Sequence, residues 1–75
     1  MLKNDVMNII KTVGIRIKEK RLKLKLTQEQ LAELCSLSAN YIGRVERGTN
    51  QAKLTTYQNI ATNLNSSVGE LFNGL

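Results

Sequence analysis

Apolar residues recur every three or four positions over most of the chain, which is the spacing of an α-helix that buries one face. The first such stretch predicts a helix that runs to about Leu24 and is capped at its start by Asn4 or Asp5. Arg21 lies at the margin of the apolar face of this helix. The face itself consists of Leu2, Val6, Ile9, Ile10, Val13, Ile17 and Leu24.

A second helix is predicted to begin after Thr27. Thr27 and Gln30 have the spacing of a capping box, in which each side chain bonds the backbone N–H of the other residue. A short break then leads to Ser38, which favours a third helix over residues 39–47, ended by Gly48. The apolar side of the second helix consists of Leu31, Ala32, Leu34 and Cys35.

The rest of the chain predicts two more helices. After a polar loop over residues 49–53, helical spacing continues over residues 54–64 and breaks at residues 65–66. Ser67 and Glu70 repeat the capping-box spacing and predict a short fifth helix. No segment alternates with a period of two, so we expect an all-α fold in which residues 1–75 form one compact domain of five helices.

Composition excludes several classes of site. The 75 residues include no His and one Cys, which cannot supply an internal disulfide, the usual zinc ligands or histidine-based catalysis. No run of apolar residues is longer than two, which argues against a signal peptide and a membrane span. We therefore expect a soluble, basic protein of a reducing compartment that is not an enzyme and uses no cofactor or metal.

The net charge of +5 is unevenly distributed along the chain. Residues 1–26 contain eight Lys and Arg against two Asp and Glu, a net +6, whereas residues 27–75 carry a net −1. The cations of the first helix are suited to steering or flanking phosphate contacts, and equally to solubility. Charge alone therefore does not locate a binding surface.

The predicted third helix has one face without an acidic residue. By helical geometry this face spans about 140° of arc. Asn can bond adenine, and Arg can bond guanine, through two hydrogen bonds each, while small residues let a helix approach the groove floor. This face of the helix could therefore read base edges in a DNA groove. The simpler alternative is a basic face that is only exposed to solvent. The residues of the face are Ala39, Asn40, Gly43, Arg44 and Arg47.

Residues 14–72 resemble the xenobiotic-response-element family of helix-turn-helix proteins, which includes Cro and the phage repressors. The resemblance implies a lambda-repressor-like fold with the helix-turn-helix at about residues 27–47 and the third helix in the major groove. The matching stretches are Gly14-Ile15-Arg16-Ile17, Arg21, Leu26-Thr27-Gln28-Glu29-Gln30-Leu31-Ala32, Leu37-Ser38, Tyr41-Ile42, Val45-Glu46-Arg47-Gly48, Ile60-Ala61 and Leu64.

The resemblance also implies roles for single residues. Ala39, Asn40 and Arg44 match base-facing positions of the family, in agreement with the face described above, to which Gly43 also belongs. Gln28 matches a residue that bonds a phosphate at the start of the second helix. Further candidates for backbone contacts, which set the register on DNA rather than read sequence, are Thr27, Ser38, Tyr41, Arg47, Thr49 and Asn50.

Arg21 and Glu46 match a pair that the family joins as a buried, structural salt bridge. Four residues depart from the family pattern. Lys25 and Ser36 occupy positions where Gly is usual, so both require a left-handed backbone. Residues 52–53 replace a frequent Pro-Ser pair, so the fourth helix is expected to begin without a side-chain cap.

One short helix reads too few base pairs to address a unique genomic site. Family members solve this by forming homodimers on pseudo-palindromic operators. We expect the dimer surface at residues 64–75, with the start of the first helix (Leu2, Val6, Ile9 and Val13) as a second candidate. The residues expected at the first surface are Leu64, Val68, Leu71, Phe72 and Leu75.

Together these features indicate a sequence-specific transcriptional regulator that binds double-stranded DNA as a homodimer. It looks most like the stand-alone controller proteins of restriction–modification systems. This resemblance implies a cytoplasmic, nucleoid-associated protein of bacterial or phage type. A phage Cro-like or chromosomal repressor is the main alternative, and an antitoxin-type protein-interaction module is a further one. The operator, activation versus repression, and contact with RNA polymerase stay open.

Overall fold

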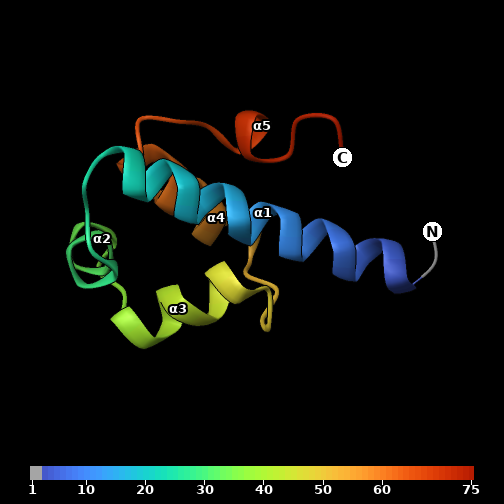
Figure 1. Ribbon diagram of the computed structural model, residues 1–75, viewed down its shortest axis with the longest axis horizontal. Coiled ribbons are helices and arrows are strands. Elements are labelled where there is room, and N and C mark those ends of the chain that lie inside the picture. Colours follow the sequence, from blue (N-terminus) through green and yellow to red (C-terminus); the bar gives the residue numbers. More distant parts are fainter. Residues whose placement is uncertain (1–2) are drawn as a thin grey trace.

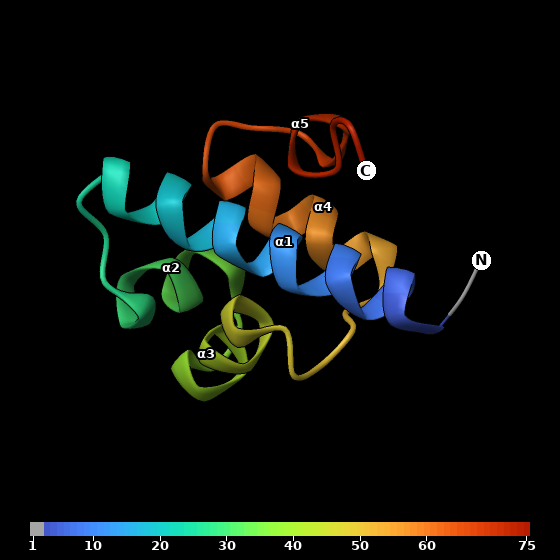
Figure 2. The same ribbon diagram turned by 45° about the vertical axis from the view of Figure 1, so that its right-hand side comes forward.

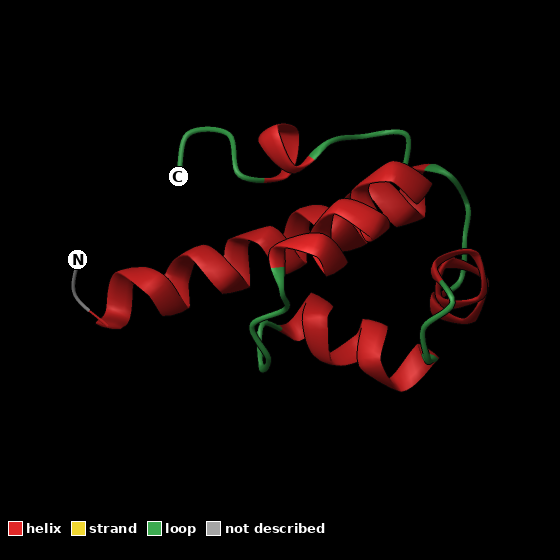
Figure 3. Cartoon of the chain, turned by 180° about the vertical axis from the view of Figure 1, so that it is seen from behind, coloured by secondary structure: helices red, strands yellow, loops and turns green. Residues whose placement is uncertain are grey.

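The computed structural model describes residues 3–75, with side chains from Asp5 onward, and contains five helices and no strand in that range. The helices are α1 (Lys3–Lys23), α2 (Gln28–Cys35), α3 (Ala39–Arg47), α4 (Leu54–Asn63) and α5 (Val68–Leu71). In Figure 1, α1 runs along the length of the molecule, with α3 on one side and α5 on the opposite side. Figures 2 and 3 show the same order, with α4 packed beside α1. The predicted all-α fold is confirmed.

The long helix α1 differs from its prediction at both ends. It already includes Lys3, so Asn4 and Asp5 lie within its first turn instead of capping it. The negative carboxylate of Asp5 at this position stabilises the helix, because the N-terminal end of the helix dipole is positive. Leu24 follows the last helical residue and is 40% exposed, because the chain turns away from the core at this point. Leu2 lies outside the described residues.

Side-chain caps fix the starts of three helices. Thr27 Oγ1 accepts from the N–H of Gln30 at 3.0 Å, and Gln30 Oε1 accepts from the N–H of Thr27 at 2.8 Å, so the first capping box is confirmed. Ser38 and Ser67 cap α3 and α5 in the same way. The second box is incomplete, because the carboxylate of Glu70 accepts from the hydroxyl of Ser66.

Left-handed residues end the first, second and fourth helices. Lys25 and Ser36 both have φ of 58°, as their departure from the family pattern predicts, and Asn65 has φ of 56°. Lys53 precedes α4 without a side-chain cap, also as predicted. The left-handed backbones of Lys25, Ser36 and Asn65 are strained for residues with a Cβ and are held by the packing of the flanking helices.

The core is formed by one face of every helix. Its largest side chains with almost no exposure are Val13, Ile17, Leu31, Ile42, Val45, Ile60 and Leu71. Leu64 is buried as well, so Leu64 and Leu71 stabilise the protomer itself and do not lie on its surface. The surface expected for residues 64–75 is therefore reduced to Val68, Phe72 and Leu75. No helix in the described range is both long and apolar enough to span a membrane.

Candidate nucleic-acid interface

Helices α2 and α3 form a tight pair joined by three residues. The left-handed Ser36 reverses the chain, and the N–H of Leu37 bonds the carbonyl of Ala32 at 2.8 Å. Ala32 is buried, and its small side chain lets the two helices pack closely. Ile42 and Val45 anchor the inner face of α3 in the core. The opposite face of α3 is consequently held rigidly at the surface.

The predicted base-facing residues of α3 differ in exposure. Asn40 is exposed, Ala39 and Arg44 are half-buried, and Gly43 is buried. A Cβ at Gly43 would lie 3.2 Å from Nη1 of Arg47 and 3.6 Å from Oε1 of Gln28. Gly43 therefore makes room for these two side chains, and its own contact with a base stays a prediction.

A buried ion pair links α1 to the inner side of α3. Arg21 Nε donates to Glu46 Oε2 at 2.7 Å and Arg21 Nη2 donates to Glu46 Oε1 at 3.0 Å, and both residues are 6% exposed. Arg21 Nη1 also donates to the carbonyl of Leu26 at 2.9 Å. The hydrogen bond to Glu46 raises the pKa of Arg21 above its usual value against the opposing effect of desolvation. The guanidinium thus stays charged, and each of its three nitrogens donates a hydrogen bond within the protein, which makes the pair structural.

Gln28 extends this ion pair to the surface. Its Nε2 donates to Glu46 Oε1 at 3.0 Å, at the same oxygen that Arg21 Nη2 contacts. The residue predicted to bond a phosphate is therefore already positioned from inside the protein. Its Oε1 accepts no hydrogen bond from the described residues, and its second amide proton is available as a donor. Nothing in the sequence pointed to this link, because its partners are 18 positions apart.

The expected phosphate contacts divide into two groups. Thr27 and Ser38 use their hydroxyl oxygens as acceptors for the helix caps and keep a proton to donate. The Thr49 hydroxyl instead donates to the carbonyl of Arg44 at 3.1 Å. Because a phosphate oxygen only accepts, the hydroxyls of Thr27 and Ser38 are suited to it, and that of Thr49 is already used. Arg47 is exposed and Asn50 half-buried near the end of α3.

Arg44 lies against Tyr41, one helical turn before it. Its guanidinium carbon is 5.6 Å from the centre of the Tyr41 ring, within the range of a cation–π contact. Its Nε is buried and has no hydrogen-bond partner. The spacing of three residues could have predicted this pair, because such side chains are neighbours on a helix.

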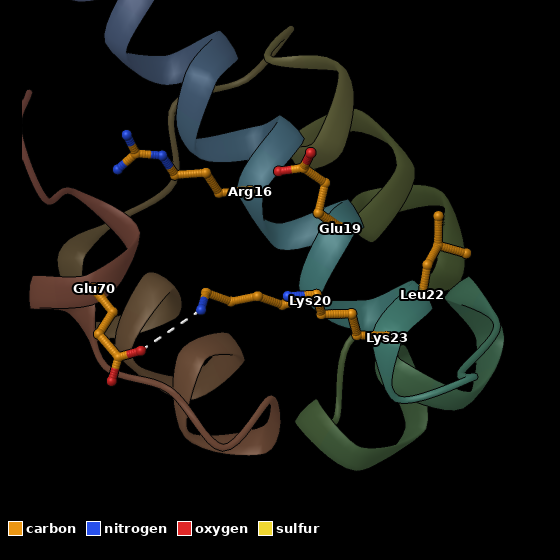
Figure 4. A pocket seen from close by; sticks show the side chains of 6 residues that line it. All are labelled: Arg16, Glu19, Lys20, Leu22, Lys23 and Glu70. Carbon is orange, nitrogen blue, oxygen red and sulfur yellow. Dashed lines mark ion pairs between the residues drawn. The ribbon is translucent and has the colours of Figure 1, made fainter.

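A group of cations on α1 serves a different purpose. Arg16 Nη1 donates to the carbonyls of Leu71 and Asn73 at 3.0 and 2.8 Å, and Lys20 lies 3.6 Å from the carboxylate of Glu70. Figure 4 shows Arg16, Lys20 and Glu70 around an open hollow between α1 and α5. Helix α5 lies on the side of α1 opposite to α3 (Figure 1). The contacts of Arg16 and Lys20 therefore attach α5 to the body of the protein.

Comparison with known proteins places the chain in a family. It matches the family model described as Helix-turn-helix over residues 17–71. It is 42% identical over 60 residues to the immunity repressor protein of Bacillus phage phi105, covering 80% of this chain and 42% of that protein. It is 48% identical over 46 residues to the control protein C.SmaI of Serratia marcescens, covering 61% of this chain and 55% of that protein.

The chain thus spans about half the length of these two relatives. The family match covers α2 and α3, which are joined by a short turn and present one rigidly held face. On this evidence the chain belongs to the helix-turn-helix family of DNA-binding regulators.

Proposed function

We propose that the protein is a sequence-specific transcriptional regulator, not an enzyme, that binds a pseudo-palindromic operator as a homodimer. The observation that carries the proposal is the acid-free outer face of α3, which holds Asn40 and Arg44 together with Gly43. The phosphate-binding candidate Gln28 adjoins this face at Gly43, where a Cβ would lie 3.6 Å from its Oε1. Asn40 and Arg44 would read base edges in the major groove. Gln28, Thr27, Ser38 and neighbouring residues would fix the register on the phosphates.

The best-supported class is a controller protein of a restriction–modification system, and the similarity to C.SmaI favours it. A phage-type repressor is the second candidate, supported by the similarity to the phi105 immunity repressor. Both classes would act on DNA in the cytoplasm. A controller that activates transcription would have RNA polymerase as a further partner.

The dimer surface proposed for this function combines the two candidate regions. An apolar hollow of about 270 Å³ lies between the first half of α1 and the start of α4. Leu54 at its edge is 67% exposed, and Phe72, which directly follows α5, also lines it. A second copy would bury this exposed apolar surface. The apolar residues lining the hollow are Val6, Ile9, Ile10, Ala52, Leu54, Tyr57 and Phe72.

Footprinting on the DNA upstream of the protein's own gene tests sequence-specific binding. We expect two protected, symmetry-related half-sites whose centres lie about one helical turn apart. The double variant Asn40→Ala with Arg44→Ala should lose this footprint and still bind random duplex DNA. Equal affinity of the unmodified protein for the upstream region and for random duplexes would disprove sequence-specific regulation.

Two leucine variants test the dimer surface by native mass spectrometry. Leu54→Asp should yield monomers, because it places a charge at the edge of the apolar hollow. Leu34→Asp is the matched control, since Leu34 is also exposed (54%) and lies on α2 outside the hollow, and it should stay dimeric. Dimers in Leu54→Asp, or monomers in both variants, would contradict this location.

A further inference from the structure

The side chain of Arg44 is ordered before any DNA is bound. Its guanidinium lies over the Tyr41 ring at 5.6 Å, and its Nε is shielded from solvent without a hydrogen-bond partner. A buried, unpaired N–H is unfavourable, so another interaction must hold the side chain in this position. The stacked ring provides it, because the electron-rich face of an aromatic ring attracts a guanidinium.

Tyr41 is in turn fixed from two directions. Its backbone N–H donates to the hydroxyl of Ser38 at 3.0 Å, which fixes the backbone at the start of α3. Its partly buried side chain packs against the hydrophobic core. It is therefore a rigid support for the more flexible arginine. Because Nε is shielded, the two terminal nitrogens of Arg44 are the donors left for the paired acceptors of guanine.

We propose that Tyr41 is a positioning residue that holds Arg44 ready to read a base, and that it does so through its ring and not through a phosphate contact of its hydroxyl. This inference rests on the proposed function, in which Arg44 faces bases. It assigns to Tyr41 a part in sequence discrimination instead of the register-setting role that the family resemblance implies.

The test compares Tyr41→Phe and Tyr41→Leu, each with Arg44 and with Arg44→Ala. Affinity is measured for the operator, for operators substituted at the base pair that Arg44 reads, and for random duplex DNA. Tyr41→Phe should bind like the unmodified protein, because the ring remains. Tyr41→Leu should lose about two- to fivefold on the operator only, the range expected from a cation–π contact. Its effect should vanish in the Arg44→Ala background. Thermal unfolding of the two Tyr41 variants, each with Arg44 and with Arg44→Ala, identifies a temperature at which all four are folded, and the affinities are measured there.

Two outcomes would overturn the inference. Equal losses for Tyr41→Phe and Tyr41→Leu on operator and random DNA would assign the hydroxyl to a phosphate. An undiminished Tyr41→Leu loss in the Arg44→Ala background would show that Tyr41 acts independently of Arg44. Failure of the proposed function looks different, because the unmodified protein would then not distinguish the operator from random DNA.

Discussion

The two helices α1 and α3 differ in how far their cations are bonded within the protein itself. The segment containing α1 holds eight of the eleven Lys and Arg residues, yet Arg16, Lys20 and Arg21 are bonded to carbonyls or carboxylates of the protein itself. Helix α3 has only two, Arg44 and Arg47, and neither forms an ion pair with an acidic side chain in the described part of the chain. Which charges are free for a partner thus depends on their contacts and not on their number.

The largest expected effect concerns the ion pair that joins the two helices. Glu46→Ala would leave Arg21 buried without its counter-charge and should cost about 3–5 kcal/mol of unfolding free energy. This is comparable to the whole stability of a domain of this size, so the variant should be largely unfolded. Urea unfolding followed by circular dichroism measures it. The exposed Glu33→Ala should change stability by less than about 0.5 kcal/mol, and similar stability of the two variants would contradict a structural role for the pair.

The close approach of α1 to α3 predicts the next effect. A Cβ at Gly14 would lie 2.5 Å from the carbonyl oxygens of Val45 and Glu46, so Gly14→Ala should separate the helices and cost about 1–3 kcal/mol. Gly69→Ala is the matched control, because the nearest atom to its Cβ is 3.7 Å away and the substitution favours a helix. Chemical unfolding of both variants checks the difference, and equal stability would show that the two helices can separate at no cost.

DNA binding should distinguish the two helices directly. Arg44→Ala is expected to cost about 1–3 kcal/mol on the operator and to relax the preference at one base pair. Lys18→Ala, on an exposed position of α1, should weaken operator and random DNA alike, and only slightly. Titrations at two salt concentrations measure both variants. A loss for Arg44→Ala that is equal on the two DNAs would remove Arg44 from the base-reading set.

The smallest effect is expected for the attachment of α5. Arg16→Ala removes two hydrogen bonds to carbonyls near the end of the chain and should cost about 1 kcal/mol, since one of them is exposed. Operator binding of the folded protein should be unchanged, because Arg16 contacts the α5 region, and α5 lies on the side of α1 opposite to α3. A selective loss of operator affinity in Arg16→Ala would mean that the cations of α1 also contribute to recognition.

Local features of the sequence determined the helices and the outer face of α3. The Thr27 and Gln30 box, the Ser38 cap and the Gly48 end involve residues three to five positions apart, so their geometry follows from the order of the residues. The same is true of the side of α3 on which Asn40 and Arg44 lie. The strained backbones of Lys25 and Ser36 were predictable because other residues occupy the usual positions of glycine.

Only the tertiary structure decided which of these residues are free. Leu64 and Leu71 have the same apolar character as Leu54, but the packing of α4 and α5 buries the first two and leaves Leu54 exposed. Likewise, the bond from Gln28 to Glu46 and that from Arg16 to Leu71 join positions 18 and 55 residues apart. The order of residues determines local bonds, whereas burial and long-range partners depend on how whole helices meet, which hydrophobic spacing alone does not specify.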